Sequence, residues 1–159
     1  SREELAGMLY ENSDEPYCEE LAKAITEEIR RGNRIDTTTK LHGVIERALD
    51  FLPEKEKQET VKKTCQRTFQ ALRIDVNHEF EVLYEFMEKL PGALKPGGRV
   101  AILTFHSGED RLVKQALKEG YREGIYFDYA KDVIRPSAQE CAQNGRARST
   151  KMRWAVRAE

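Results

Sequence analysis

Residues 94–111, LKPGGRVAILTFHSGEDR, decide the fold class of this chain. Pro96-Gly97-Gly98 predicts a turn, and Val100–Phe105 is a short apolar run of strand length. Ser107 is placed to cap a following helix, with Asp110 at its third position. A turn, a strand and a polar loop in this order are common in open α/β sheets, whose ligands gather at the C-terminal ends of strands.

Two further strands are predicted downstream, at Tyr126–Ala130 and Met152–Val156. Met152, Trp154 and Val156 alternate with more polar neighbours, as in a half-buried strand. The predicted order is a helical block followed by strand, helix, strand, loop and strand. This order indicates a helical domain joined to the tail end of an α/β sheet.

The residues before position 94 predict helices. Ser1 and Glu4 have the spacing of a capping box. A second helix is expected from about Pro16 to Arg31, and a threonine at 37–39 is expected to cap a third, which Pro53 ends. Residues 54–66 are polar and predict either a loop or a solvated turn of helix. A fourth helical stretch begins near Arg67 and continues to Leu90, either in one piece or broken at Asn77.

Composition excludes several classes of protein. The 159 residues carry a net charge of −1, and no apolar run approaches the roughly 20 residues of a membrane span. The three cysteines are widely spaced, which favours a reducing compartment. Neither a P-loop nor a Gly-x-Gly-x-x-Gly after a strand is present, and no histidine has metal-ligand spacing, so the residues predict no cofactor or metal site.

The charge is distributed unevenly. Residues 1–29 hold nine acidic and two basic residues, whereas residues 141–158 hold five basic residues and no acid. The basic end could meet an anion such as nucleic acid, or it could be a solvated tail.

Two polar segments could carry chemistry. Residues 105–111 combine an imidazole, a hydroxyl, two carboxylates and a guanidinium, which fits either a substrate-facing loop or ordinary helix capping around a structural His106. Residues 144–153 hold two arginines, a hydroxyl and a lysine, which could bind phosphates or form a solvated loop.

Four segments, in this order, resemble the MraW (RsmH) family. They are Thr68–Ile74 with Val76-Asn77, Pro96–Arg99, Phe105–Ser107 with Glu109–Arg111, and Arg146–Ser149. These bacterial enzymes use S-adenosylmethionine to methylate the exocyclic N4 of a cytosine in small-subunit ribosomal RNA. The resemblance implies a cytoplasmic protein whose partner is ribosomal RNA or the small ribosomal subunit. This sequence departs from the family at Gly108, where a leucine is usual, and at Gly145, where a proline is usual.

The resemblance also implies a fold and a division of the chain. The family has a class I methyltransferase (Rossmann-like) fold with an inserted helical domain. We therefore expect a helix-rich α/β chain, with a helical substrate-recognition domain at 1–66 and a partial methyltransferase domain, holding the C-terminal strands of the sheet, at 67–159. The family's glycine-rich cofactor loop is not in this sequence. Hence we expect no S-adenosylmethionine bound to this chain alone, and a chain inactive by itself.

Site residues are carried over from the family motifs. The candidates for the catalytic site are His106, Ser107, Glu109 and Asp110, with no base assigned. The candidates for contacts with RNA phosphates are Arg34, Lys40, Arg67, Arg73, Arg146, Arg148, Lys151 and Arg153.

The function predicted is therefore part of a ribosomal RNA cytosine-N4 methyltransferase that recognises RNA and forms part of the acceptor site. The alternatives are a non-catalytic RNA-binding or interaction module derived from the family, and a purely structural remnant. Because Val100–Phe105 is apolar on both faces, it predicts a central strand whose neighbour is missing here. We accordingly expect a homodimer that covers the open sheet edge.

Overall fold

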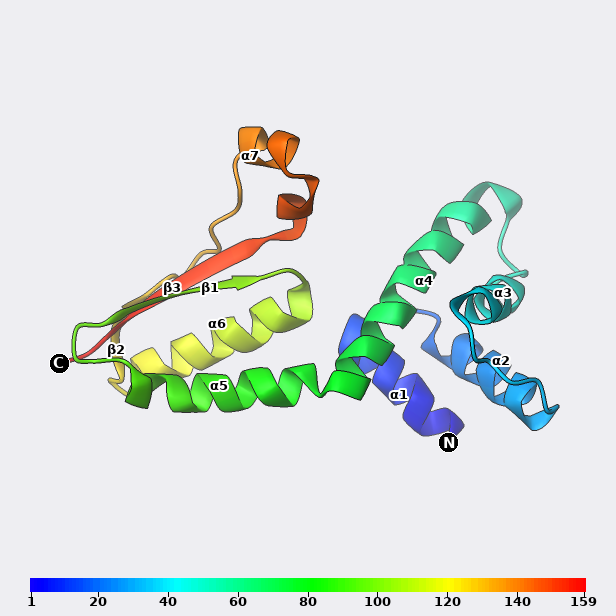
Figure 1. Ribbon diagram of the computed structural model, residues 1–159, viewed down its shortest axis with the longest axis horizontal. Coiled ribbons are helices and arrows are strands. Elements are labelled where there is room, and N and C mark those ends of the chain that lie inside the picture. The colour runs from blue at the N-terminus through cyan, green and yellow to red at the C-terminus, as the bar shows by residue number, and fades with distance from the viewer. The chain divides into compact units, whose positions relative to one another are not determined.

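The computed structural model describes residues 1–159, which divide into two units, Ser1–His78 and Glu79–Glu159. The elements of the first unit are α1 (Arg2–Ser13), α2 (Cys18–Arg30), α3 (Thr38–Ala48) and α4 (Glu54–Asn77), drawn from blue to green in Figure 1. The elements of the second unit are α5 (Glu79–Ala93), β1 (Arg99–Thr104), α6 (Ser107–Arg122), β2 (Tyr126–Tyr129), α7 (Ala138–Gln143), the 3-10 helix η1 (Gly145–Ser149) and β3 (Lys151–Arg157).

The caps of the first unit follow the sequence closely. Ser1 caps α1 in a complete capping box with Glu4, and Thr37 caps α3 by accepting a hydrogen bond from the Lys40 amide. Both caps confirm the prediction. The prediction of a fourth helix from Arg67 needs correction, because α4 already begins at Glu54.

α4 is helical throughout residues 54–66 because it buries a narrow stripe. Val61, Thr64 and Cys65 are buried at spacings of three and four residues, while the charged residues between them face solvent. The helix ends at His78, whose φ of 51° is left-handed. The boundary that we expected between residues 66 and 67 thus falls inside a continuous helix, and the division lies after His78.

A buried carboxylate connects the core of the first unit to α4. Glu15 has no exposed surface. Its Oε2 accepts a hydrogen bond from Arg67 Nε at 2.7 Å, and its Oε1 accepts from Thr64 Oγ1 at 3.2 Å and from the Tyr17 amide at 3.1 Å. A charge without water needs such partners, so Arg67 is held inside the fold.

The sheet of the second unit has the order β1-β3-β2, and β3 is antiparallel to both neighbours. Arg99 pairs with Val156 and Thr104 pairs with Lys151, so β1 is matched along its whole length. Since β1 and β2 are both antiparallel to β3, they run in the same direction, and α6 forms the crossover between them. β1 therefore lies at an edge of this sheet.

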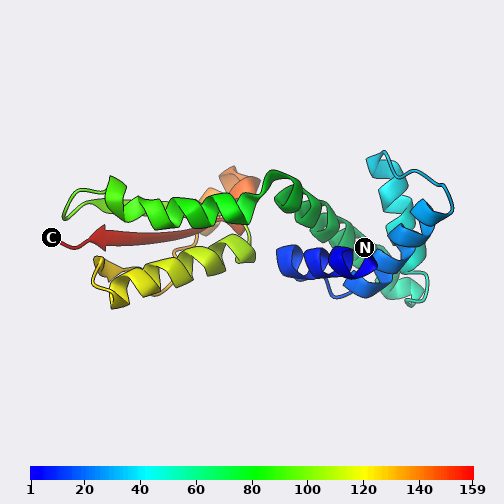
Figure 2. The same ribbon diagram turned by 90° about the horizontal axis from the view of Figure 1, so that it is seen from below.

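Helices α5 and α6 lie side by side over one face of the sheet, as Figures 1 and 2 show. Met87 and Leu90 from α5 meet Val113 and Leu117 from α6 in a core that includes Ala155 of β3. The opposite face is more exposed. It carries a shallow apolar depression, and the large apolar side chains that are exposed on or beside this sheet are Leu103, Phe105, Phe127 and Ile134.

The face of β3 that is buried is the less apolar of its two faces. Arg153 and Ala155 are buried, whereas Met152, Trp154 and Val156 are only half-buried. Asp110 of α6 supplies a partner for Arg153, which allows an arginine to occupy the covered face. No helix of the chain is long and apolar enough to cross a membrane.

Candidate functional site

The candidate site is the turn between β1 and α6, at the C-terminal end of β1. His106 is the N-cap of α6, in extended conformation, and its Nδ1 accepts a hydrogen bond from the Glu109 amide at 3.3 Å. Ser107, which we expected to be the cap, is instead the first helical residue, and it is exposed. The imidazole nitrogen therefore accepts the capping hydrogen bond, which a side-chain hydroxyl or carboxylate accepts at most helix N-termini.

Glu109 closes the turn from the helix side. Its Oε1 lies 3.0 Å from His106 Nε2, and its Oε2 accepts a hydrogen bond from the Phe105 amide at 3.1 Å. The side chains of His106 and Glu109 are 11% and 21% exposed, so the pair is largely shielded but reachable from solvent. One carboxylate therefore fixes both the imidazole and the last backbone amide before it.

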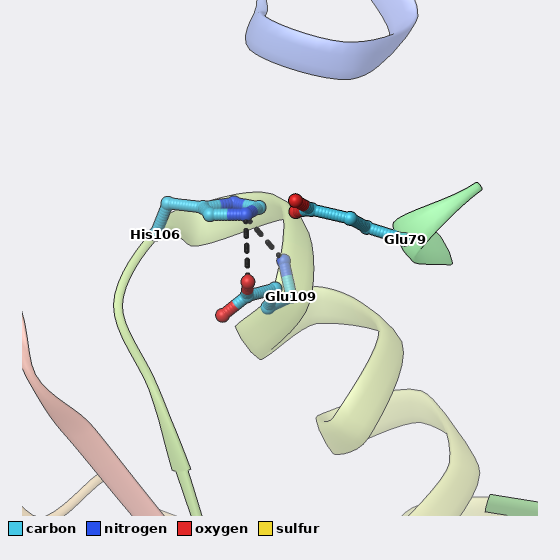
Figure 3. A group of neighbouring side chains, drawn as sticks. All are labelled: Glu79, His106 and Glu109. Carbon is cyan, nitrogen blue, oxygen red and sulfur yellow. Dashed lines mark hydrogen bonds and ion pairs between the residues drawn. The ribbon is translucent and has the colours of Figure 1, made fainter. Parts of the chain in front are cut away.

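Glu79, the first residue of α5, joins this pair (Figure 3). One potential ligand atom from each of Glu79, His106 and Glu109 lies within 4.8 Å of the other two. Carboxylate and imidazole are donors that divalent cations accept. However, Nδ1 already accepts the hydrogen bond of the Glu109 amide, and Nε2 lies 3.0 Å from Glu109 Oε1 as an ion pair when the ring is protonated, without the geometry of a hydrogen bond. The geometry describes an imidazole in close contact with one carboxylate and beside a second.

An aromatic ring supports the imidazole from α5. The rings of Phe80 and His106 meet edge to face, with centroids 5.9 Å apart. A Cβ at Gly108 would lie 2.7 Å from Phe80 Cζ and 3.2 Å from His106 Nδ1. Glycine at this position thus leaves the space that Phe80 fills.

Asp110 has a different partner from the other residues of the turn. Its two oxygens accept hydrogen bonds from Arg153 Nε at 2.8 Å and from Arg153 Nη2 at 3.2 Å. Arg153 Nη1 donates to the carbonyls of Ala130 and Lys131. This bidentate pair anchors the first turn of α6 to the centre of the sheet.

The eight basic candidates fall into different environments. Arg153 is 5% exposed and bonded to Asp110, and Arg67 is bonded to buried Glu15, so both have their guanidinium groups committed within the fold. Lys40 is exposed and pairs with Asp36 at 2.6 Å, and Lys151 is half-buried. The remaining candidates are exposed: Arg34, Arg73, Arg146 and Arg148.

Arg146 and Arg148 project from η1 on either side of buried Ala147. Asn144 caps this short helix by accepting a hydrogen bond from the Arg146 amide at 3.1 Å. Two exposed cations are therefore held on an ordered turn that leads into β3.

Sequence reasoning missed Glu79 and Phe80, which reach the turn from α5. They precede β1 by about one helix length, and only the packing of α5 against α6 brings them to His106. An acidic residue at the start of a helix is too common to have singled out Glu79.

Comparison with known proteins decides the family. A model of the MraW methylase family matches residues 1–158. The chain belongs to the MraW methylase family. It is 86% identical over 159 residues to ribosomal RNA small subunit methyltransferase H 1 of Agathobacter rectalis, covering all of this chain and 46% of that protein.

Other relatives carry closely similar names. The chain is 68% identical to ribosomal RNA small subunit methyltransferase H 1 of Lachnoclostridium phytofermentans, across 99% of the chain and 43% of that protein. It is 58% identical to methyltransferase H 2 of Alkaliphilus metalliredigens, across 99% of the chain and 45% of that protein. The chain thus spans less than half the length of these MraW relatives.

Proposed function

We propose that this chain is the part of an S-adenosylmethionine-dependent ribosomal RNA cytosine-N4 methyltransferase that recognises RNA and forms one side of the acceptor site. The observation that carries the proposal is membership of the MraW methylase family over residues 1–158. The names of the relatives support a small-subunit ribosomal RNA substrate. The helical unit would serve substrate recognition, and the unit with the sheet would belong to the methyltransferase domain.

The acceptor site would lie at the turn after β1. The amino group of cytosine is a poor nucleophile because its lone pair is delocalised into the ring. The enzyme must therefore hold this group in line with the methyl group and receive the proton that it loses. S-adenosylmethionine, when bound, supplies the methyl group. This chain has no glycine-rich loop after a strand, so its own residues do not fit that cofactor, and we assign them no step through it.

The proposed roles of the four candidates follow from their contacts. Glu109 faces His106 at 3.0 Å, so this pair is suited to orient an amino group or receive a proton. Ser107 is exposed and could donate or accept a hydrogen bond at the rim. Asp110 is occupied by Arg153, so we propose that it positions the turn without touching the substrate.

The chain's contacts with RNA would come from exposed cations, above all Arg146 and Arg148 on η1. To test this, binding of a small-subunit ribosomal RNA transcript is measured against salt for the chain and for Arg146→Ala with Arg148→Ala. Each lost phosphate contact should lower the log–log salt slope by about 0.7–0.9. A matched control replaces the exposed α6 residues Lys118 and Arg122 by Ala. An unchanged slope in the η1 variant would count against this role.

The methyltransferase role is tested in a chimera. This chain replaces the matching 159 residues of the Agathobacter relative, from which it differs at only 14% of positions. Glu109→Gln in the chimera should lower kcat by about 100-fold or more if the carboxylate takes part in proton transfer. Ser107→Ala should act mainly on KM. A chimera that folds and binds RNA but transfers no methyl group would favour the alternative, a non-catalytic RNA-binding module.

A further inference from the structure

A groove of about 520 Å³ lies in the helical unit, between the end of α2, the following loop and one face of α3. Its floor is apolar and comes from Ile35, Gly43 and Val44, of which Val44 is buried in the core. Its rim is polar and carries three cations, Arg34, Lys40 and Arg47. An apolar floor beneath a cationic rim matches the two halves of a nucleotide, a flat base and a phosphate.

The groove holds one acidic residue, and that residue is already occupied. Glu28 is 18% exposed, and its Oε2 accepts a hydrogen bond from Asn33 Nδ2 at 3.0 Å. Its carboxylate also lies 3.9 Å from Arg47 Nη2, a distance too long for a strong hydrogen bond. Arg47 thus keeps most of its five donors available.

Arg34 is the most available cation of the rim. It is exposed and makes no hydrogen bond or ion pair within the chain. Lys40, by contrast, is held by Asp36. Arg34 and Arg47 are therefore the two lining side chains whose donors are available to an anion.

Gly43 keeps the floor of the groove open. It lies in the interior of α3, where glycine costs about 1 kcal/mol relative to alanine. An added Cβ would meet only Arg47 Nη1, at 3.3 Å, which is the far end of a flexible side chain. Packing within the helical unit therefore does not require glycine at position 43. The space that a larger side chain would fill there is part of the groove.

We propose that this groove binds one nucleotide of single-stranded RNA, with the base against Ile35 and Val44 and a phosphate contacted by Arg34 and Arg47. The proposal deepens the proposed function and rests on it, since it names where the helical unit holds the RNA. No aromatic side chain lines the groove, so the base packs on aliphatic groups without stacking. The contact therefore holds the strand while reading little sequence.

The test uses fluorescence anisotropy with a fluorescein-labelled single-stranded RNA octamer of mixed sequence and three variants of the full chain. Arg34→Ala with Arg47→Ala should weaken binding about tenfold or more at 0.1 M salt and reduce the salt slope by about 0.7 for each contact. Gly43→Leu fills the groove without changing its charge. It should therefore weaken binding, while the remaining binding, which comes from the rim cations, keeps its salt dependence. Arg30→Ala, which removes a nearby exposed cation outside the groove, should leave affinity within about twofold.

Thermal unfolding of each variant confirms that α3 is intact. If Gly43→Leu binds the octamer as tightly as the unaltered chain, the groove is not the site and the proposal is wrong. In that case a loss of binding in the Arg146 and Arg148 variant would still support the proposed function. If the unaltered chain binds no RNA at all, both proposals fail. If a fluorescein-labelled polyglutamate peptide binds more tightly than the octamer and loses affinity in Gly43→Leu, the groove takes an acidic peptide and the RNA assignment is overturned.

Discussion

Phe80 occupies the space that a side chain at Gly108 would need. The Cζ atom of its ring lies 2.7 Å from the position of a Cβ at residue 108, and the same ring meets His106 edge to face. The three residues form one packing unit, in which the orientation of the imidazole depends on the absence of a side chain two residues further along the chain.

Gly108→Leu should therefore destabilise the second unit by about 1–3 kcal/mol, because the side chain overpacks against Phe80 and His106. Phe80→Ala should cost less in combination with Gly108→Leu than alone, since the leucine would fill part of the space that the missing ring leaves. Urea denaturation of the four proteins in a double-mutant cycle measures the coupling. Strictly additive effects would show that the two residues do not share this space.

Asp110→Ala should destabilise the chain by about 3–5 kcal/mol, because it leaves the buried guanidinium of Arg153 without its carboxylate. Arg148→Ala, which removes an exposed arginine near the same strand, should change stability by less than about 0.5 kcal/mol. The free energy of unfolding in urea distinguishes the two. Equal, small effects would show that Arg153 is solvated.

Cys65 should react with thiol reagents much more slowly than Cys18 and Cys141. Burial raises the pKa of the Cys65 thiol, with smaller contributions from Glu46 and Glu15, whereas the other two cysteines are half-buried. Fewer thiolates at a given pH and less access both slow alkylation. Mass spectrometry after iodoacetamide treatment at pH 8 reports the order. Labelling of all three at one rate would contradict the packing of α4.

The same thiol gives stability a pH dependence. Because the folded-state pKa of Cys65 is raised above that of the unfolded chain, the unfolded chain loses the proton first as pH rises. The contribution of the thiol is therefore complete below the unfolded pKa and is lost as pH rises through the folded pKa. Cys65→Ala should remove this alkaline dependence in urea titrations, whereas Cys141→Ala should retain it.

Isothermal titration of this chain with S-adenosylmethionine should give no heat of binding. No strand in the chain is followed by a glycine-rich loop that opens a helix, which is the unit that binds such cofactors. Micromolar binding would overturn this expectation and would locate cofactor contacts among the residues described here.

Two copies of the chain should associate through the second unit. β1 pairs only with β3, so its other edge presents unpaired amide and carbonyl groups, and Leu103 beside that edge is 56% exposed. Sedimentation equilibrium over a concentration series should report a dimer, and Leu103→Lys should shift it toward monomer. A monomer mass at high micromolar concentration would rule the dimer out.

Local signals predicted much of the fold. Ser1, Thr37 and the Pro96-Gly97-Gly98 turn act within a few residues of themselves, and the structure places two caps and a strand where they indicate. Residues 54–66 were harder, because a helix that buries only a narrow stripe has the composition of a solvated segment.

The candidate site was predictable only in part, because its contacts are tertiary. The segment that holds His106 and Glu109 stood out in the sequence, but Glu79 and Phe80 reach it only through the packing of α5 on α6. Arg153 is basic and lies in a basic segment, and nothing local distinguishes an arginine that pairs with Asp110 from one that faces solvent.

The order β1-β3-β2 has a consequence for the synthesis of the protein. β1 and β2 do not pair with each other, and each depends on β3 for its hydrogen bonds. While the ribosome is adding residues before Lys151, α5, β1, α6 and β2 have no strand to join them, although the helical unit is already complete. The two units therefore complete their hydrogen bonding at different times, and β1 gains its partner within this chain only after β3 has been synthesised.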